Sequence, residues 1–228
     1  MEENGRLRAG AGLSACDLKC IAVFSMLVDH IGAFLYPSQL WMRYVGRLAF
    51  PIFGFLIAEG FWHSRNVKKY MGRLLLFALL SEVPYDLARC NQPVDMGHQN
   101  VYFTLLLALF CMYVLQRLQG HFFAACGILA AVFALAHYVI KPDYGMGGIA
   151  MILCFYLFRT QRAGMFLSVA AVNICYYGNI QTAGALALIP IRFYNGEKGP
   201  SAKYFFYAFY PVHLLVLYLL RRYLIDVV

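Results

Sequence analysis

The segment of residues 18–36 restricts what this chain can fold into more than any other part of the sequence. It is apolar and, at about 20 residues, long enough to cross a bilayer as a helix. Asp29 and His30 nevertheless lie side by side inside it. Ionisable side chains at such a depth need a partner or a water-filled cavity, so they indicate a functional site.

The composition of the whole chain indicates a membrane protein. Of its 228 residues, 62% are hydrophobic and 13% are charged, and a soluble domain of this size cannot bury so much apolar surface. We therefore predict an all-α, polytopic integral membrane protein in which residues 1–228 form a single bundle in contact with lipid. About nine transmembrane helices are expected, at residues 18–36, 45–62, 72–88, 100–118, 121–140, 144–159, 163–178, 182–193 and 204–221.

The positions of lysine and arginine predict the orientation in the membrane. With nine spans, most of these residues lie on the side of the N-terminus, which makes residues 1–17 a cytoplasmic tail. Eight spans stay open as an alternative, because they would move Arg221 and Arg222 to the inner side. The segment 182–193 is too short to cross unaided and suggests a half-helix or a re-entrant piece. In either arrangement Asp29 and His30 lie near the outer end of the first helix.

Charge and metal-ligand patterns exclude two classes of function. The net charge of +8 does not indicate nucleic-acid binding, because the basic residues lie in short runs between apolar segments. The seven cysteines form no Cys-x-x-Cys pair, and the six histidines have neither His-x-x-x-His nor His-Glu-x-x-His spacing. We therefore expect no metal site.

The first two segments carry most of the candidate site residues. On a helix Lys19 and His30 fall close to one line, with Asp29 about 80° away. Arg47 lies near the same outer boundary and is expected to pair with Asp29, either for chemistry or only for helix packing. Near the inner end, Glu59 is expected to form a local hydrogen bond with a histidine four residues later.

A basic turn follows on the inner side. It contains four cations within a few positions, Arg65, Lys68, Lys69 and Arg73. Positive-inside bias accounts for much of this density. The functional alternative is a clamp for a cytosolic polyphosphate such as the nucleotide end of coenzyme A, bound by charge because no Walker or Gly-x-Gly-x-x-Gly motif is present.

The remaining polar positions leave several roles open. Glu82 and Asp86 lie one turn apart and suggest acid–base work or a cation path, unless they face Arg89 or Arg43. Further along the chain, Asn100 and Asp143 are expected to cap the helices that follow them, and Asn173 belongs to a polar cluster in an apolar region. The last segment adds three more candidates, Tyr207, Tyr210 and His213.

Six ordered motifs resemble the TraX family of membrane acetyltransferases, and they extend over nearly the whole chain. They are Lys19 with Asp29-His30-Ile-Gly, Gly46-Arg-Leu-Ala-Phe-Pro-Ile-Phe53, Ala58-Glu-Gly60, Asp143-Tyr-Gly145, Tyr194-Asn-Gly-Glu-Lys-Gly199 and Phe206-Tyr-Ala-Phe-Tyr-Pro-Val-His213. The named member of that family acetylates the N-terminus of conjugative pilin. The family is also similar to wider transmembrane acyltransferases, in which a histidine on an early helix serves transfer from cytosolic acetyl-CoA to an acceptor across the membrane.

This resemblance implies a multi-pass acetyltransferase of the bacterial inner membrane, with acetyl-CoA as donor. His30 would act as general base or transient acyl carrier, with Asp29 and Arg47 as catalytic partners and Arg47 or Tyr207 as oxyanion donor. The basic turn would bind acetyl-CoA. Substrate contacts would come from Lys19, Glu59, Glu82, Asn173, Tyr207, Tyr210 and His213.

The acceptor remains open in this interpretation. It is the N-terminus of a peptide, a sugar, a lipid or a small molecule, and an oligomer is compatible with the sequence. The alternative class is a proton-coupled transporter of small molecules that uses Asp29, His30 and Glu82 as a relay. Stabilisation by acetyl-CoA distinguishes an acetyltransferase from a transporter.

Overall fold

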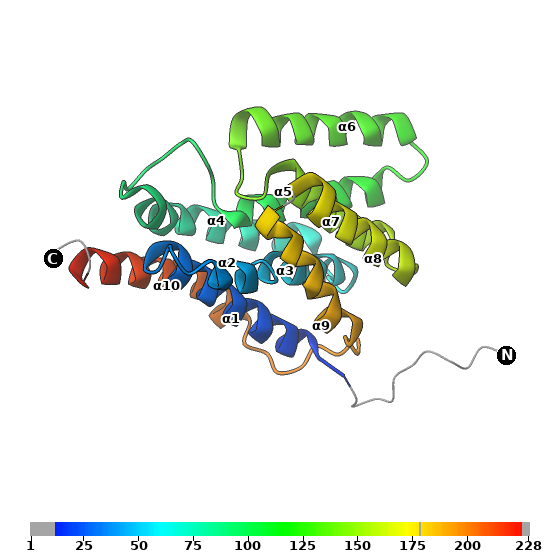
Figure 1. Ribbon diagram of the computed structural model, residues 1–228. Helices are drawn as coiled ribbons and strands as arrows, with labels where there is room; N and C mark the ends of the chain where they lie inside the picture. The colour runs from blue at the N-terminus through cyan, green and yellow to red at the C-terminus, as the bar shows by residue number, and fades with distance from the viewer. Residues whose placement is uncertain (1–11, 178, 225–228) are drawn as a thin grey trace.

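The computed structural model describes residues 12–177 and 179–224, and every named element in these ranges is a helix (Figure 1). The elements are α1 (Ala15–Phe34), α2 (Leu40–Gly46), α3 (Ala49–Trp62), α4 (Val67–Cys90), α5 (Val101–Arg117), α6 (Phe122–Leu135), the π-helix η1 (Ala136–Ile140), α7 (Gly145–Leu157), α8 (Arg162–Ala171), the π-helix η2 (Val172–Tyr177), the 3₁₀-helix η3 (Asn179–Ala187), α9 (Leu188–Arg192) and α10 (Lys203–Leu224). Each of the nine apolar segments forms helix, so the predicted all-α fold is confirmed. The predicted tail of residues 1–17 lies mostly outside the described residues.

Three helical stretches of the described chain are both long enough and apolar enough to cross a membrane. They are Leu40–Trp62, Phe122–Ile140 and Lys203–Tyr223. The helices Val101–Arg117 and Gly145–Leu157 are apolar but shorter. The structure therefore supports membrane helices, while the number of nine spans stays a prediction.

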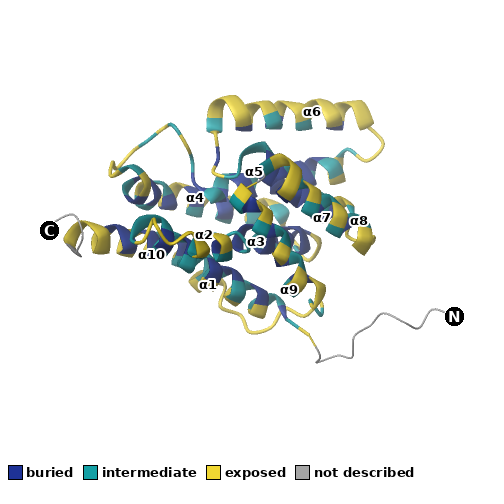
Figure 2. Cartoon of the chain, in the orientation of Figure 1, coloured by how far each residue is buried: buried dark blue, intermediate teal, exposed yellow. Residues whose placement is uncertain are grey.

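Helix α6 is the part of the molecule that requires lipid most clearly. Only 17% of the stretch Phe122–Ile140 is buried, and Figure 2 shows α6 as a largely exposed helix at the edge of the bundle. A helix that is apolar on all sides and not covered by protein needs an apolar solvent. The protein core lies elsewhere, where α3, α5 and α7 meet around residues such as Ile52, Leu109 and Ile149.

Side-chain caps fix where several helices begin. Ser14 and Asp17 form a reciprocal capping box at the start of α1. Asn66 caps α4, and the predicted cap of α5 by Asn100 is confirmed by its bond to the Tyr102 N–H. These bonds satisfy backbone donors that have no partner inside the helix.

The start of α1 is tied to the segment that leads into α10. The Leu13 N–H donates to the Phe193 carbonyl, and the Ala15 N–H donates to the Glu197 carbonyl. Because both helices begin at this end and pack together, they run in the same direction. Before this segment, Asn179–Ala187 form a 3₁₀-helix and Leu188–Arg192 a five-residue α-helix. A half-helix or re-entrant piece at 182–193 stays a prediction.

Candidate functional site

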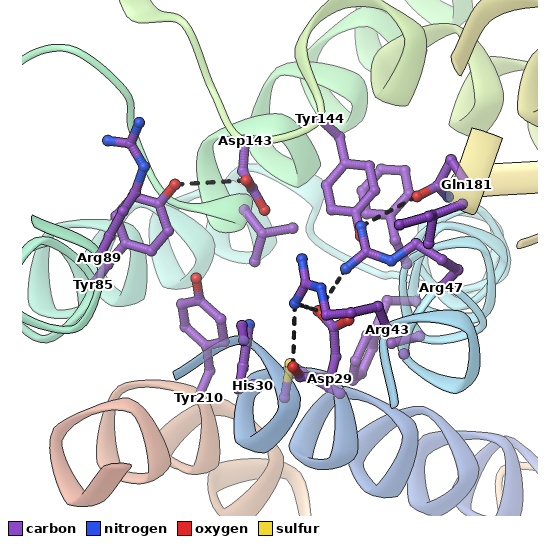
Figure 3. A pocket seen from close by; sticks show the side chains of 18 of the residues that line it. Asp29, His30, Arg43, Arg47, Tyr85, Arg89, Asp143, Tyr144, Gln181 and Tyr210 are labelled. Atoms are coloured by element: carbon purple, nitrogen blue, oxygen red, sulfur yellow. Dashed lines mark hydrogen bonds and ion pairs between the residues drawn. The ribbon is translucent and has the colours of Figure 1, made fainter. Parts of the chain in front are cut away.

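A cavity of about 560 Å³ lies inside the bundle, next to the ionisable pair of α1 (Figure 3). We call it the His30 cavity. Its wall is built from the later turns of α1, the end of α2, the starts of α3 and α5, the end of α4, the turn around residue 143, the end of η2, the start of η3 and the first half of α10. Polar and charged side chains line it from these separate elements, so the cavity is a candidate for chemistry.

Asp29 forms a buried cluster with two arginines. Its Oδ2 atom lies 2.5 Å from Arg47 Nη2 and 3.0 Å from Arg43 Nη1, which confirms the predicted pair with Arg47 and adds a second cation. Arg47 also reaches Gln181, at 3.4 Å. The Arg47 Nε atom is buried and has no hydrogen-bond partner among the described residues, so the cluster retains one unused donor beside the cavity.

A glycine makes this cluster possible. A Cβ atom on Gly46 would lie 2.1 Å from the Cβ of Asp29, so α1 and α2 approach each other as closely as glycine allows. The helical chain then breaks at Arg47 and Leu48, and Pro51 lies in the first turn of α3, where its missing N–H costs nothing. This break turns Arg47 toward Asp29.

We expect Gly46→Ala to destabilise the protein by at least about 1–3 kcal/mol, because the added methyl forces Asp29 out of its place. Thermal unfolding in mild detergent measures the change. Gly127→Ala is the matched control, since a Cβ at Gly127 meets no atom within 4 Å. Equal unfolding temperatures for both variants would contradict the close approach of α1 and α2.

His30 forms a hydrogen-bonded pair with His213 from α10. The His30 Nδ1 and His213 Nε2 atoms are 2.7 Å apart, and His213 Nδ1 lies 2.7 Å from the Phe209 carbonyl. A carbonyl only accepts, so His213 Nδ1 carries a proton and donates it to that bond. When both rings are neutral, His30 Nδ1 therefore donates to His213, and the Nε2 lone pair of His30 remains free.

Pro211 lies two residues before His213, and it leaves a backbone carbonyl of α10 free to accept a hydrogen bond from α5. Proline lacks the N–H that would bind the Tyr207 carbonyl in an α-helix, and that carbonyl instead accepts from the Tyr102 hydroxyl at 3.0 Å. Tyr102 also packs edge-on against Tyr210. The motif around Pro211 thus positions His213 and Tyr210 together.

Asp143 is not the predicted helix cap. The cap position of α7 is Tyr144, without a side-chain bond, and the Asp143 carboxylate instead faces the His30 cavity, 3.5 Å from the Tyr85 hydroxyl (Figure 3). The Asp143 side chain is accessible from the cavity, and the surrounding protein limits its contact with bulk water. This burial raises the pKa of Asp143, and Arg47 acts in the opposite direction.

The other acidic candidates lie outside this cavity. Glu82 accepts hydrogen bonds from the side chain and backbone N–H of Asn100, and Asp86 accepts from the Asp95 N–H. The alternative left open by the sequence, that they face Arg89 or Arg43, is not seen as ion pairs among the described residues, because Arg89 pairs with Asp95 and Arg43 with Asp29. Since Glu82 is held at the helix start, it forms no relay with His30.

Asn173 has a supporting position behind the cavity. It is fully buried in η2, donates to the Val169 carbonyl at 2.9 Å and accepts from Gln181 at 3.1 Å. Gln181 in turn contacts Arg47. Departures from α-helix such as η2 are frequent at functional sites, and here the departure connects Asn173 with the cluster.

A second cavity, of about 440 Å³, lies at the end of the bundle where α1 and α10 begin. We call it the basic-end cavity. The sequence-predicted residues that line it are Lys19, Glu59, Arg73 and Tyr207. Arg65, Lys68 and Lys69 do not line it, and two lysines that the sequence analysis did not select, Lys198 and Lys203, do so. Of the four cations of the basic turn, Arg73 alone lines this cavity, and the lysines that line it come from separate elements.

Glu59 is held by a partner that the local pattern did not predict. Its carboxylate accepts from Arg159 Nε at 2.7 Å, whereas His63 Nδ1 donates to the Glu59 backbone carbonyl at 2.8 Å and lies 3.9 Å from the carboxylate. The local hydrogen bond is thus confirmed for the backbone. The stronger contact comes from residue 159, far along the chain.

Four functional candidates were missed by sequence reasoning, namely Arg43, Asp143, Tyr144 and Gln181. Arg43 and Asp143 carried a signal, because both are charged residues at segment boundaries. Tyr144 lies in the Asp143-Tyr-Gly145 motif but was given no role there, and Gln181 is an ordinary polar residue of η3 that no local pattern distinguishes.

Apolar helices around a cavity that polar and charged side chains help to line, with a histidine pair beside it, define a helical membrane protein with a candidate site inside the bundle. The chain belongs to the TraX family, since the family model described as TraX protein matches residues 14–221. It is 31% identical to the "Probable fimbrial assembly protein FimC, serogroup H1" of Dichelobacter nodosus, over 90% of this chain and 94% of that protein. It is 24% identical to the "Protein TraX" of Escherichia coli, over 88% and 84% of the two chains. No solved structure matches the chain.

Proposed function

We propose that this protein is an inner-membrane acetyltransferase that transfers an acetyl group from acetyl-CoA to a hydroxyl or amine acceptor. The observation that carries the proposal is the free Nε2 atom of His30 in a polar cavity, with its tautomer set by His213. An imidazole of this kind is the usual general base near neutral pH. Membership of the TraX family supports the same reaction.

The arrangement of the two cavities supports a donor that enters from the basic end. Lys19 lines the basic-end cavity and His30 lines the other, on nearly the same face of α1. Eleven residues of helix separate them by about 16 Å along the axis. That distance suits the pantetheine arm of acetyl-CoA, with its phosphates among the cations and its thioester close to His30. With the N-terminus inside, the basic end faces the cytoplasm.

The reaction assigns a role to each group in the His30 cavity. His30 Nε2 takes the proton of the acceptor, whose oxygen or nitrogen forms a bond to the thioester carbon. The carbon–sulfur bond then breaks, and coenzyme A leaves as a thiolate that takes up the proton. Arg47 Nε, which has no partner among the described residues, and the Tyr210 hydroxyl are the candidate donors to the oxyanion. Tyr207 lines the basic-end cavity and not the His30 cavity, so it has no oxyanion role in this mechanism.

The proposal is tested with purified protein, labelled acetyl-CoA and membrane or peptide extracts. We expect label to appear in an acceptor that mass spectrometry identifies, with release of free coenzyme A. Direct transfer gives sequential kinetics, whereas an acetyl-imidazole on His30 gives ping-pong kinetics. Absence of both label transfer and stabilisation by acetyl-CoA would reject the function.

We expect the double variant Lys198→Ala Lys203→Ala to weaken acetyl-CoA binding about 10-fold or more, because charge-assisted contacts to phosphate are lost. Both lysines are exposed, so the fold should be unaffected. The matched control is Lys68→Ala Lys69→Ala, which removes the same charge from the basic turn outside the cavity. The dependence of the unfolding temperature on acetyl-CoA concentration measures both affinities. A larger loss in the control would restore the clamp that the sequence predicted.

A further inference from the structure

The two cavities are neighbours in the bundle and share part of their lining. Four residues line both of them, namely Phe53, Tyr102, Leu105 and Phe206. We call these four residues the shared wall. His30 lines only the cavity on one side of it, and the cations Lys198 and Lys203 line only the cavity on the other.

The two sides of the shared wall differ in how firmly they are held. Tyr102 and Leu105 are 6% and 5% exposed, lie three residues apart on α5 and so share one face of that helix. The hydroxyl bond of Tyr102 to the Tyr207 carbonyl adds to this restraint. Phe53 and Phe206 are only half-buried, and Phe206 lies under the Lys19 ammonium at 5.5 Å.

A donor that spans both cavities must place its thioester at this wall. This step rests on the proposed function, with phosphates in the basic-end cavity and the carbonyl carbon within reach of His30. The acyl group then lies among the four side chains, or it extends into the space that the acceptor needs. An acetyl group requires room for one methyl group, whereas each added methylene must displace a wall residue or the acceptor.

We infer that the shared wall selects acetyl over longer acyl groups, and that Leu105 is its main specificity-determining residue. Leu105 is apolar, nearly fully buried and carried by a core helix, so it cannot move aside for a longer chain. A packed apolar pocket discriminates one methylene by about 10-fold or more. Discrimination between acetyl and butyryl groups is expected to reach at least that size.

The test compares acetyl-CoA and butyryl-CoA as ligands of the full-length protein in mild detergent. Their apparent dissociation constants follow from the rise in unfolding temperature with concentration. We expect wild type to favour acetyl-CoA by about 10-fold or more, and Leu105→Ala to reduce this ratio by about 10-fold. Leu109→Ala is the matched control, because Leu109 is fully buried one turn further along α5 and lines neither cavity.

A second variant keeps the test decisive if Leu105→Ala is poorly folded. Phe206→Leu changes the half-buried side of the wall and is expected to shift the ratio in the same direction. An unchanged ratio in both wall variants, or equal affinity of wild type for the two ligands, would overturn the role of the wall while leaving the proposed function intact. A wild-type protein stabilised by neither ligand would overturn the proposed function as well.

Discussion

Replacing His30 with alanine is expected to lower acetyl transfer by about 10²–10⁴-fold, which is the contribution of a positioned general base. The half-buried ring lines the His30 cavity and contributes no charge to the Asp29 cluster. The protein should therefore keep its fold and its affinity for acetyl-CoA. Initial rates of label transfer, measured beside acetyl-CoA stabilisation, separate loss of chemistry from loss of binding.

Two further variants test whether His213 acts on the substrate itself or only positions His30. His213→Ala removes the acceptor for the His30 Nδ1–H, whereas His213→Gln can offer a carbonyl oxygen in its place. If His213 is a positioning residue, the glutamine variant should recover part of the rate that alanine loses. His137→Ala is the control, since this exposed histidine of η1 lines neither cavity. Full transfer by His30→Ala would exclude His30 as the base.

Replacing Asp29 with alanine is expected to cost about 3–5 kcal/mol of stability, because it leaves buried cations without their counter-charge. The Asp29 side chain is 9% exposed, and those of Arg47 and Arg43 are 17% and 29% exposed. The free energy of unfolding, measured with denaturant in detergent, checks this value. The double variant Asp29→Ala Arg47→Ala should cost less than the sum of the single ones.

The pair of Arg89 and Asp95 is the natural control for this prediction. It has the same 3.0 Å separation as the contact of Arg43 with Asp29, but its side chains are 36% and 30% exposed. Solvent screens such a pair, so Asp95→Ala should cost about 1 kcal/mol or less. If Asp29→Ala were no more costly than Asp95→Ala, the cluster would not stabilise the contact between α1 and α2.

The candidate site illustrates which inferences local sequence supports. Asp29 and Arg47 were predicted as partners because two ionisable side chains at one depth in an apolar environment need each other. The same rule did not place Asp143, because a charged residue at a loop position is free to cap a helix, face solvent or line a cavity. The four cations of the basic turn were grouped because they are adjacent in sequence, yet only Arg73 lines the basic-end cavity.

The sequence by itself determined the helical segments, their apolar character and the position of Asp29 and His30 inside an apolar helix, because these properties depend on composition and on the periodicity of neighbouring residues. Only the tertiary structure decided which distant residues meet. His30 and His213 are 183 positions apart, and the four residues that line both cavities come from α3, α5 and α10. Helix packing brings these side chains together, and the residue pattern within a single helix does not show which other helix packs against it.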